Sequence, residues 1–358
     1  MTSKRRNVSA ADSILNEPPH RKKTARTAPG NSSQKIHRRQ GLRFAALDLG
    51  TNNCRLLIAA PSKNGLRIVD AFSRIVRLGE GLTQTGMLSQ DAMARTREAL
   101  IICAEKIKRR GVSHMRCIAT QACRAAGNGA TFLDSIETET GLTFDIISTK
   151  EEARLAASGC AELLDPNVSA GLVFDIGGGS TEISWMRKLH DKHEVVAWTS
   201  LSFGVVTLSE NWGGREIDRA TYRAIIEKIR HEIRAVGDPA GLQHFFQNDD
   251  AHVLGTSGTV TSIAGVFLGL KRYRRDKVDG LWLDSKEALA TAIRLQTMNF
   301  EERAKEPCIG RDRADLVVCG CAILEALLLE WPSSRIRVAD RGLREGILAD
   351  LAEQAGRA

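Results

Sequence analysis

Two short segments of this chain share one pattern at a separation of 127 residues. The first runs Ala46-Leu47-Asp48-Leu49-Gly50-Thr51-Asn52, and the second runs Phe174-Asp175-Ile176-Gly177-Gly178-Gly179-Ser180-Thr181-Glu182. In each, an apolar run with an aspartate leads into a glycine-rich turn with hydroxyl groups, and a second apolar run follows. A buried strand that turns sharply on glycine exposes backbone N–H groups, which can bind an anion such as phosphate. The repeat therefore predicts two related domains that face each other across a phosphate-binding cleft.

The elements around each repeat indicate an α/β protein with mixed sheets, because three strands are followed by alternating helices and strands in both halves. We expect strands over 43–47, 55–60, 66–76, 115–120, 146–148, 172–175, 182–185, 194–199, 253–254 and 336–338. We expect helices from the N-cap Ser89 to Gly111 and over 151–164, 216–235, 285–298, 312–330 and 343–353, with one more after Gly255–Thr259. The break at Asp165-Pro166-Asn167 predicts a first domain over 41–168 and a second over 169–340, with a last helix, 341–358, that packs on the first domain.

The net charge of +8 is confined to one end of the chain. Residues 1–40 hold ten Lys or Arg and two acids, so they carry the whole excess and the rest of the chain is neutral. Their composition predicts a disordered basic arm, either a solvated tail or a segment that contacts an anionic polymer. The neutral body argues against a specific nucleic-acid partner. Since we find no signal peptide and no apolar run long enough for a membrane span, we expect a soluble, cytoplasmic protein without a membrane partner.

The glycine turns and their aspartates are the candidate phosphate and metal site. Glycines at 177–179 would let backbone N–H groups approach a phosphate without a Cβ in the way, although a tight turn with positive φ is the alternative reading. Asp48 and Asp175 suit Mg²⁺, or Mn²⁺ in its place, which one or two carboxylates and substrate phosphates usually hold, although each could instead cap its own turn. The candidate phosphate ligands are Gly177, Gly178, Gly179, Ser180 and Thr181 on one wall and Gly50, Thr51, Asn52 and Asn53 on the other.

Arginines near these turns are candidate phosphate clamps. The guanidinium forks of Arg55 and Arg124 match phosphate oxygens in a bidentate manner, although surface salt bridges are the alternative. The basic run Lys271-Arg272-Tyr273-Arg274-Arg275 could steer a polyanion toward the cleft or simply form a solvated loop. Metal-like spacings are absent among the eight histidines and eight cysteines, which argues against a zinc site.

Six motifs in this order make the chain resemble the exopolyphosphatase / guanosine pentaphosphate phosphatase (Ppx/GppA) family over about 41–350. They are Ala46 to Arg55, Ala119 to Arg124, Glu151 to Leu155, Asp175 to Glu182, Gly255 to Thr259, and Asp340 to Gly346. The chain departs from the family pattern at Asn53, where a serine is common. The sequence ends at residue 358, and we expect it to be a short form without the C-terminal helical module of long members.

The resemblance implies a fold and roles for individual residues. It implies the duplicated actin-like, ribonuclease-H-like ATPase fold, two domains of mixed sheets flanked by helices with a cleft between them. It points to Glu152 as the general base that activates water, although without the resemblance Glu151 and Glu152 would be taken as ordinary acids in the first turn of a helix. Glu182 lies on the exit strand of the second hairpin, within reach of the same cleft, and we expect it to be a second catalytic carboxylate that orients the water or binds a hydrated Mg²⁺. Glu151 would support the start of its helix. Gly255–Thr259 would be structural rather than nucleotide-binding.

We therefore expect a hydrolase that removes the terminal phosphate of inorganic polyphosphate with Mg²⁺, acting as a homodimer. Cleavage of the 5′-terminal phosphate of guanosine pentaphosphate is the close alternative, because it uses the same chemistry. Two alternatives belong to other classes: a non-catalytic protein that binds polyphosphate or the alarmone, and an ATP-using kinase of the same superfold.

Overall fold

The computed structural model describes residues 41–357 except 64 and 191, so the predicted basic arm over 1–40 lies outside the described residues. The first half contains β1 (Phe44–Leu49), β2 (Asn53–Ser62), β3 (Gly65–Ile75), α2 (Leu82–Thr85), α3 (Gln90–Arg109), β4 (His114–Ala119), α4 (Gln121–Ala125), α5 (Gly129–Thr140), β5 (Phe144–Ile146), α6 (Thr149–Cys160) and the 3₁₀ turn η1 (Ala161–Leu163). Its five strands form one sheet in the order β3-β2-β1-β4-β5.

The second half contains β6 (Ala170–Ile176), β7 (Thr181–Leu189), β8 (Lys192–Leu201), α7 (Val205–Trp212), α8 (Arg219–Val236), α9 (Gln243–Gln247), β9 (Ala251–Thr256), α10 (Gly258–Phe267), α11 (Arg275–Val278), β10 (Trp282–Asp284), α12 (Ser285–Thr297), α13 (Phe300–Lys305), α14 (Val317–Glu330), β11 (Arg335–Ala339) and α15 (Leu343–Arg357). Its six strands form a second sheet in the order β10-β11-β9-β6-β7-β8.

The two sheets have the same topology. In each, the first strand pairs antiparallel with the second and parallel with the fourth, as β1 does with β2 and β4, and β6 with β7 and β9. Only β10, which pairs antiparallel at the edge of the second sheet, has no counterpart in the first. The predicted duplication with mixed sheets is confirmed.

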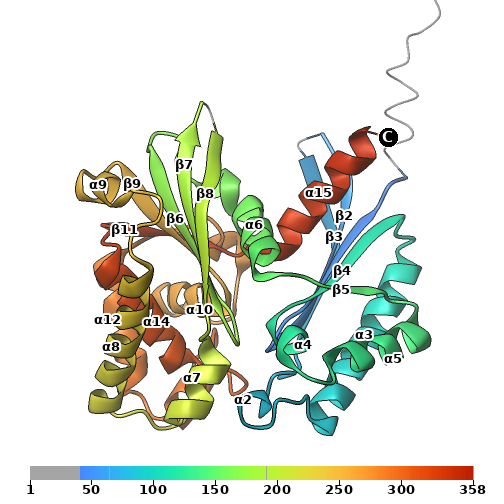
Figure 1. Ribbon diagram of the computed structural model, residues 1–358, viewed down its shortest axis with the longest axis horizontal. Helices are drawn as coiled ribbons and strands as arrows, with labels where there is room; N and C mark the ends of the chain where they lie inside the picture. The colour runs from blue at the N-terminus through green and yellow to red at the C-terminus, as the bar shows by residue number, and fades with distance from the viewer. Residues whose placement is uncertain (1–40, 64, 191, 358) are drawn as a thin grey trace, which may run out of the picture. The chain divides into compact units, whose positions relative to one another are not determined.

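The central strands are apolar because helices or strands cover both of their faces. In β1 the side chains of Phe44 and Leu47 are both almost fully buried, although they point to opposite sides of the sheet. Helix α14 is buried nearly all round, which explains its continuous apolar sequence VVCGCAILEALLLE. Figure 1 shows α3 and α5 beside the first sheet, α8, α12 and α14 beside the second, and α6 with α15 between the two.

Helices α6 and α15 connect the halves. Leu155 of α6 shares a core with Phe44 of β1 and Ile347 of α15, whereas Ala157 and Cys160 of α6 share another with Val173 of β6. Helix α15 therefore returns to pack on the first sheet, next to β1.

Local capping decides two helix starts. Ser89 caps α3, as predicted, and its Oγ accepts a hydrogen bond from the Ala92 N–H at 3.2 Å. Ser148 caps α6 in the same way with the Glu151 N–H at 3.2 Å. The predicted strand over 146–148 is therefore wrong in its bounds: β5 ends at Ile146, because Ser148 already belongs to the start of the helix.

Within the described residues, no helix has the length and apolar character needed to span a bilayer.

Candidate active site

The two predicted hairpins have the same register but opposite charges at one position. In the first hairpin Asp48 of β1 lies directly across from Arg55 of β2, and in the second Asp175 of β6 lies directly across from Glu182 of β7. Directly opposite residues on an antiparallel pair interact through their side chains. The first aspartate therefore has a cation beside it, and the second has another carboxylate.

The turns of the two hairpins meet. A Cβ added to Gly178 would lie 2.9 Å from the Thr51 Cβ, so only glycine allows this approach. Glycines 177–179 do not adopt positive φ, so a left-handed turn is not the reason for them. Within the described part of the chain, the backbone N–H groups of Thr51, Asn52, Gly178 and Gly179 donate no hydrogen bond. The two turns together therefore present free N–H donors to an anion.

A cavity of about 600 Å³ opens beside these turns. Its lining includes twelve of the predicted site residues: Asp48, Gly50, Thr51, Asn52, Asn53, Arg55, Glu152, Asp175, Gly177, Gly178, Gly179 and Ser180. A third glycine turn, between β9 and α10, also lines it, where Ser257 has a left-handed φ of 111°. The structure thus brings segments from both halves of the chain to one concave site.

Burial disfavours the charged form of both aspartates, and nearby cations offset this effect only in part. Burial raises the pKa of Asp48, although the charge of Arg55 opposes this. Burial and the neighbouring Glu182 raise the pKa of Asp175 to about 7, again against Arg55. A bound cation would favour the ionised form of both carboxyls.

Two buried amides add oxygen atoms to this wall. The side-chain oxygens of Asn52 and Asn53 are buried and have no hydrogen-bond partner among the described residues. A buried acceptor without a donor is unfavourable. A water molecule that is bound to a metal, or that bridges to a phosphate, can supply that donor. The donor set therefore fits a hydrated hard cation such as Mg²⁺. No group of three His, Cys, Asp or Glu side chains within the described residues is arranged to hold a metal by itself, so waters or phosphate oxygens would have to complete the shell.

Five arginines line the same cavity. Arg275 and Arg341 pair with carboxylates, whereas Arg55 from β2, Arg313 before α14 and Arg344 at the start of α15 form no ion pair with another described residue. The guanidinium groups of Arg55 and Arg344 make no hydrogen bond or ion pair with any other described residue. The guanidinium of Arg313 makes only a 3.4 Å contact with the Ser262 hydroxyl. Burial and the nearby charge of Arg55 lower the pKa of Arg313. Guanidinium groups gathered without ion pairs favour a polyanionic ligand. Sequence reasoning missed Arg313 and Arg344, although Arg344 lies in the last family motif.

The predicted base and one predicted clamp are paired with each other. Arg124 Nη1 lies 3.2 Å from a carboxylate oxygen of Glu152, and it also donates to the carbonyl of Ile147 at 2.7 Å. Burial and the charge of Glu182 raise the pKa of Glu152 well above its ordinary value, although Arg124 opposes this. Glu151 instead turns away to Arg154 and Arg116, which hold its pKa at about 2. Only Glu152 of this acidic pair lines the large cavity.

Three of the predicted site residues do not line the large cavity. The Thr181 side chain is fully buried and its hydroxyl donates to the carbonyl of Phe203 at 2.9 Å, so the expected phosphate contact has no support from this geometry and stays a prediction. Glu182 is buried and accepts from the Ser200 hydroxyl at 2.9 Å, so its expected role beside the metal stays a prediction. Arg124 lines a smaller neighbouring cavity.

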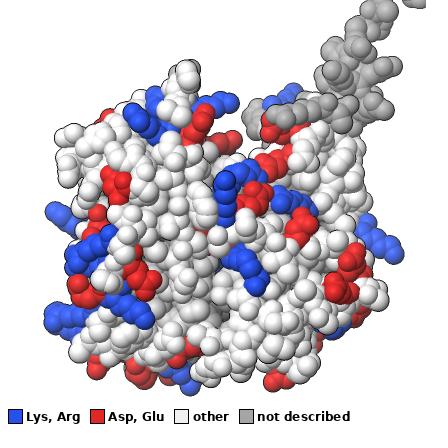
Figure 2. Space-filling model, in the orientation of Figure 1, with Lys and Arg blue, Asp and Glu red and all other residues white. Residues whose placement is uncertain are grey.

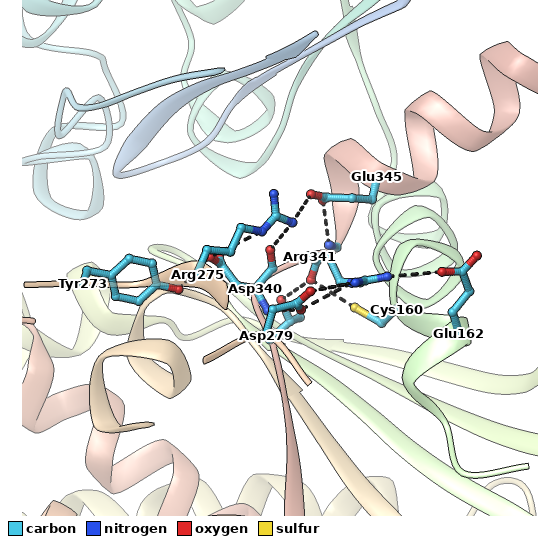
Figure 3. Close-up of polar contacts among 10 residues, drawn as sticks. Cys160, Glu162, Tyr273, Arg275, Asp279, Asp340, Arg341 and Glu345 are labelled. Carbon is cyan, nitrogen blue, oxygen red and sulfur yellow. Dashed lines mark hydrogen bonds and ion pairs between the residues drawn. The ribbon is translucent and has the colours of Figure 1, made fainter. Parts of the chain in front are cut away.

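The wall made by the last motif is held by a polar network, which Figure 3 shows. Arg341 donates to Asp279 at 2.6 Å and to Glu162 at 3.2 Å, so it ties the segment before α15 to α11 and η1. Tyr273 donates to Asp340 at 2.6 Å and Arg275 donates to Glu345 at 2.8 Å. These contacts fix the segment that carries Arg344.

Two of the four cations in the basic run over 271–275 are paired with carboxylates. Arg274 pairs with Asp276, and Arg275 pairs with Glu345, which leaves Lys271 and Arg272 as cations without an ion pair among the described residues. On the face that Figure 2 shows, basic and acidic side chains are interspersed. Any steering of a polyanion would therefore come from the arginines inside the cavity more than from this run.

Comparisons with known proteins agree with this geometry. The model of the Ppx/GppA phosphatase family matches residues 57–355. Exopolyphosphatase 2 of Mycobacterium tuberculosis is 30% identical over 329 residues, which cover 87% of this chain and 98% of that protein. The guanosine-5'-triphosphate,3'-diphosphate pyrophosphatase of Pseudoalteromonas translucida is 28% identical over 306 residues, but this chain covers only 58% of its length.

The fold agrees as well. The crystal structure of the Aquifex aeolicus member of the Ppx/GppA family matches with a TM-score of 0.72 at 27% identity, covering 87% of this chain and 98% of that one. The duplicated actin-like fold expected from the resemblance is thereby confirmed. Because the family model matches most of this chain, the chain belongs to the Ppx/GppA phosphatase family.

Proposed function

We propose that this protein is an exopolyphosphatase, a phosphoanhydride hydrolase that removes the terminal phosphate of inorganic polyphosphate with Mg²⁺. One observation carries the proposal: free N–H donors of two facing turns, three arginines that form no ion pair, and three carboxyls of raised pKa, Glu152 among them, line the same cavity. Phosphoryl transfer needs positioning and charge neutralisation more than covalent chemistry, and this arrangement offers both.

The substrate would lie along the cavity as an extended anion. The terminal phosphate would accept hydrogen bonds from the N–H groups of Thr51, Asn52, Gly178 and Gly179 and from the Ser180 hydroxyl. Arg55, Arg313 and Arg344 would hold the following phosphates. A chain of phosphates offers each of the three guanidinium groups its own set of acceptor oxygens.

The expected metal would be held by Asp48 and Asp175, through direct or water-mediated contacts that also reach the Asn52 and Asn53 oxygens. When bound, Mg²⁺, or Mn²⁺ in its place, would neutralise phosphate oxygens as charge develops on them. Glu182 lies directly across from Asp175, and its negative charge raises the pKa of that aspartate. It would therefore act as a positioning residue that tunes the metal-binding carboxylate.

Glu152 would accept a proton from the attacking water. A general base works best when its pKa lies near the working pH, and burial moves Glu152 in that direction. Arg124 would hold the carboxylate in place through their ion pair. The water oxygen would then bond to the terminal phosphorus while the bridging P–O bond breaks, leaving the shortened chain in the cavity.

Guanosine pentaphosphate is the second candidate substrate, and one observation favours it. Tyr273 lines the cavity and leaves 38% of its surface exposed, so its ring could stack on a base. Relatives named for either substrate match this chain. The homodimer and the cytoplasmic location stay predictions from the sequence.

The test compares both substrates with purified full-length protein and three forms: wild type, Glu152→Gln and the matched control Glu151→Gln. We expect orthophosphate release from polyphosphate with Mg²⁺, a loss of at least a hundredfold in kcat for Glu152→Gln, and a change of less than threefold for Glu151→Gln. Faster release from guanosine pentaphosphate would favour the second substrate. Tight binding without release would indicate a non-catalytic sensor, and ATP turnover alone would indicate a kinase; either result rejects the proposal.

A further inference from the structure

A second cavity of about 340 Å³ lies next to the first and shares four lining residues with it: Thr51, Gln121, Gly179 and Ser180. Its other walls carry hydroxyl groups from both halves of the chain and one guanidinium. They are Thr83, Thr149, Ser200, Ser202, Thr207 and Arg124. The function proposed above leaves this cavity without a role.

Gln121 is one of the four residues that line both cavities, and its side chain contacts two of the others. The Thr51 hydroxyl donates to Gln121 Oε1 at 2.9 Å. A Cβ on Gly179 would come within 2.1 Å of the same oxygen, so the glutamine packs directly on the turn that would hold the terminal phosphate. Among the four shared residues, Gln121 therefore supplies a long flexible side chain at the end where hydrolysis would take place.

An ion pair crosses from one cavity to the other. Glu152 lines the large cavity and Arg124 lines the small one, and the two side chains meet at 3.2 Å. While Glu152 is ionised, it neutralises Arg124. Once Glu152 is protonated, Arg124 keeps its charge and has no ion-pair partner among the described residues.

We propose that the small cavity is an orthophosphate-binding site that receives the product, with Arg124 as its anion-binding residue and Gln121 as its gate. This inference rests on the proposed function. Water adds to the terminal phosphorus, the bridging P–O bond breaks with its electron pair going to the shortened chain, and one water proton goes to Glu152. The new orthophosphate then faces Arg124 at the moment its counter-charge is lost. It leaves through the small cavity while the polymer stays in the large one.

The test is a direct binding measurement that needs no turnover. Radiolabelled orthophosphate is titrated into the full-length protein with Mg²⁺ and a saturating, non-hydrolysable oligophosphate whose bridging oxygens are replaced by methylene groups. We expect orthophosphate to bind while the analogue occupies the large cavity. Ala125→Leu, at an exposed position that lines only the small cavity, should weaken this binding at least tenfold. The exposed Ala130→Leu on α5 is the matched control and should change it less than twofold.

Ser202→Leu fills the same cavity from the second half of the chain, so it replaces Ala125→Leu if that variant does not fold. Complete displacement of orthophosphate by the analogue in the wild type would overturn the inference, because it would show a single shared site. Equal binding in the wild type and in a folded cavity-filling variant would also overturn it. A protein that binds orthophosphate in this way but hydrolyses neither substrate would refute the proposed function and leave the site standing.

Discussion

Asp48 and Asp175 occupy equivalent positions, but their cross-strand neighbours give them different titration behaviour. Arg55 lies across from Asp48, and Glu182 lies across from Asp175, whose pKa is raised to about 7. An aspartate that titrates near 7 in the folded state and near 4 in the unfolded state favours folding most at low pH. The contribution of Asp175 to the free energy of unfolding is lost as the pH rises from about 4 to about 7.

Asp175→Asn should therefore stabilise the metal-free protein at pH 8 and have little effect at pH 4. We expect a gain on the order of 1–3 kcal/mol at pH 8, since each pH unit between the two pKa values corresponds to about 1.4 kcal/mol and relaxation reduces the sum. The same variant should lose the stabilisation that Mg²⁺ gives the wild type. Chemical denaturation with and without Mg²⁺ at both pH values measures this, and a variant less stable than wild type at pH 8 without metal would contradict it.

Single residues also show how much of the candidate site could be predicted from the sequence. Most of the predicted site residues line one cavity, because the repeat marks strand ends that a shared topology brings together. Thr181 and Glu182 are buried and do not line the cavity, because a strand residue next to a turn can face the core as readily as the cleft. Arg313 and Gln121 were missed because their roles depend on contacts with distant segments, such as Thr51 with Gln121, which no local pattern encodes.

At the scale of elements, α6 and α15 cross at glycines. A Cβ on Gly159 would lie 1.9 Å from the Gly342 carbonyl oxygen, and one on Gly346 would lie 2.2 Å from the Leu155 carbonyl oxygen. Both neighbours are backbone atoms, so the helices would have to separate. The sequence predicted both helices but not this crossing, since close approach between helices is a tertiary property.

Gly346→Ala should therefore destabilise the protein by about 1–3 kcal/mol, although alanine favours helices more than glycine does. Gly356→Ala is the matched control in the same helix: its position is exposed, so we expect a small gain of up to about 1 kcal/mol from helix propensity alone. Thermal unfolding of both variants provides the comparison. A Gly346→Ala protein as stable as the control would show that the crossing tolerates a side chain.

At the scale of the whole molecule, side chains near the turns join the two halves of the duplicated fold. Arg77, just after β3, makes two hydrogen bonds with Asp315, before α14, at 2.9 and 3.0 Å. Nearby, the Gly81 N–H and the Thr83 hydroxyl donate to Glu210 of α7 at 2.7 and 3.0 Å. Since the substrate cavity takes its walls from both halves, these bonds hold the walls at their spacing.

Arg77→Met should therefore weaken substrate binding more than it slows the chemical step. Loss of a half-buried bidentate pair worth about 1 kcal/mol corresponds to a rise of about fivefold in KM for polyphosphate, with kcat within twofold. Arg74→Met is the matched control, because Arg74 pairs with Glu98 inside the first half at 3.7 Å and should leave KM unchanged. Raising the salt concentration should weaken binding in both variants through the exposed charges, so the ratio of their KM values is the informative quantity. Equal KM values for the two variants, or a fall confined to kcat, would show that the bonds between the halves do not set the spacing of the cavity walls.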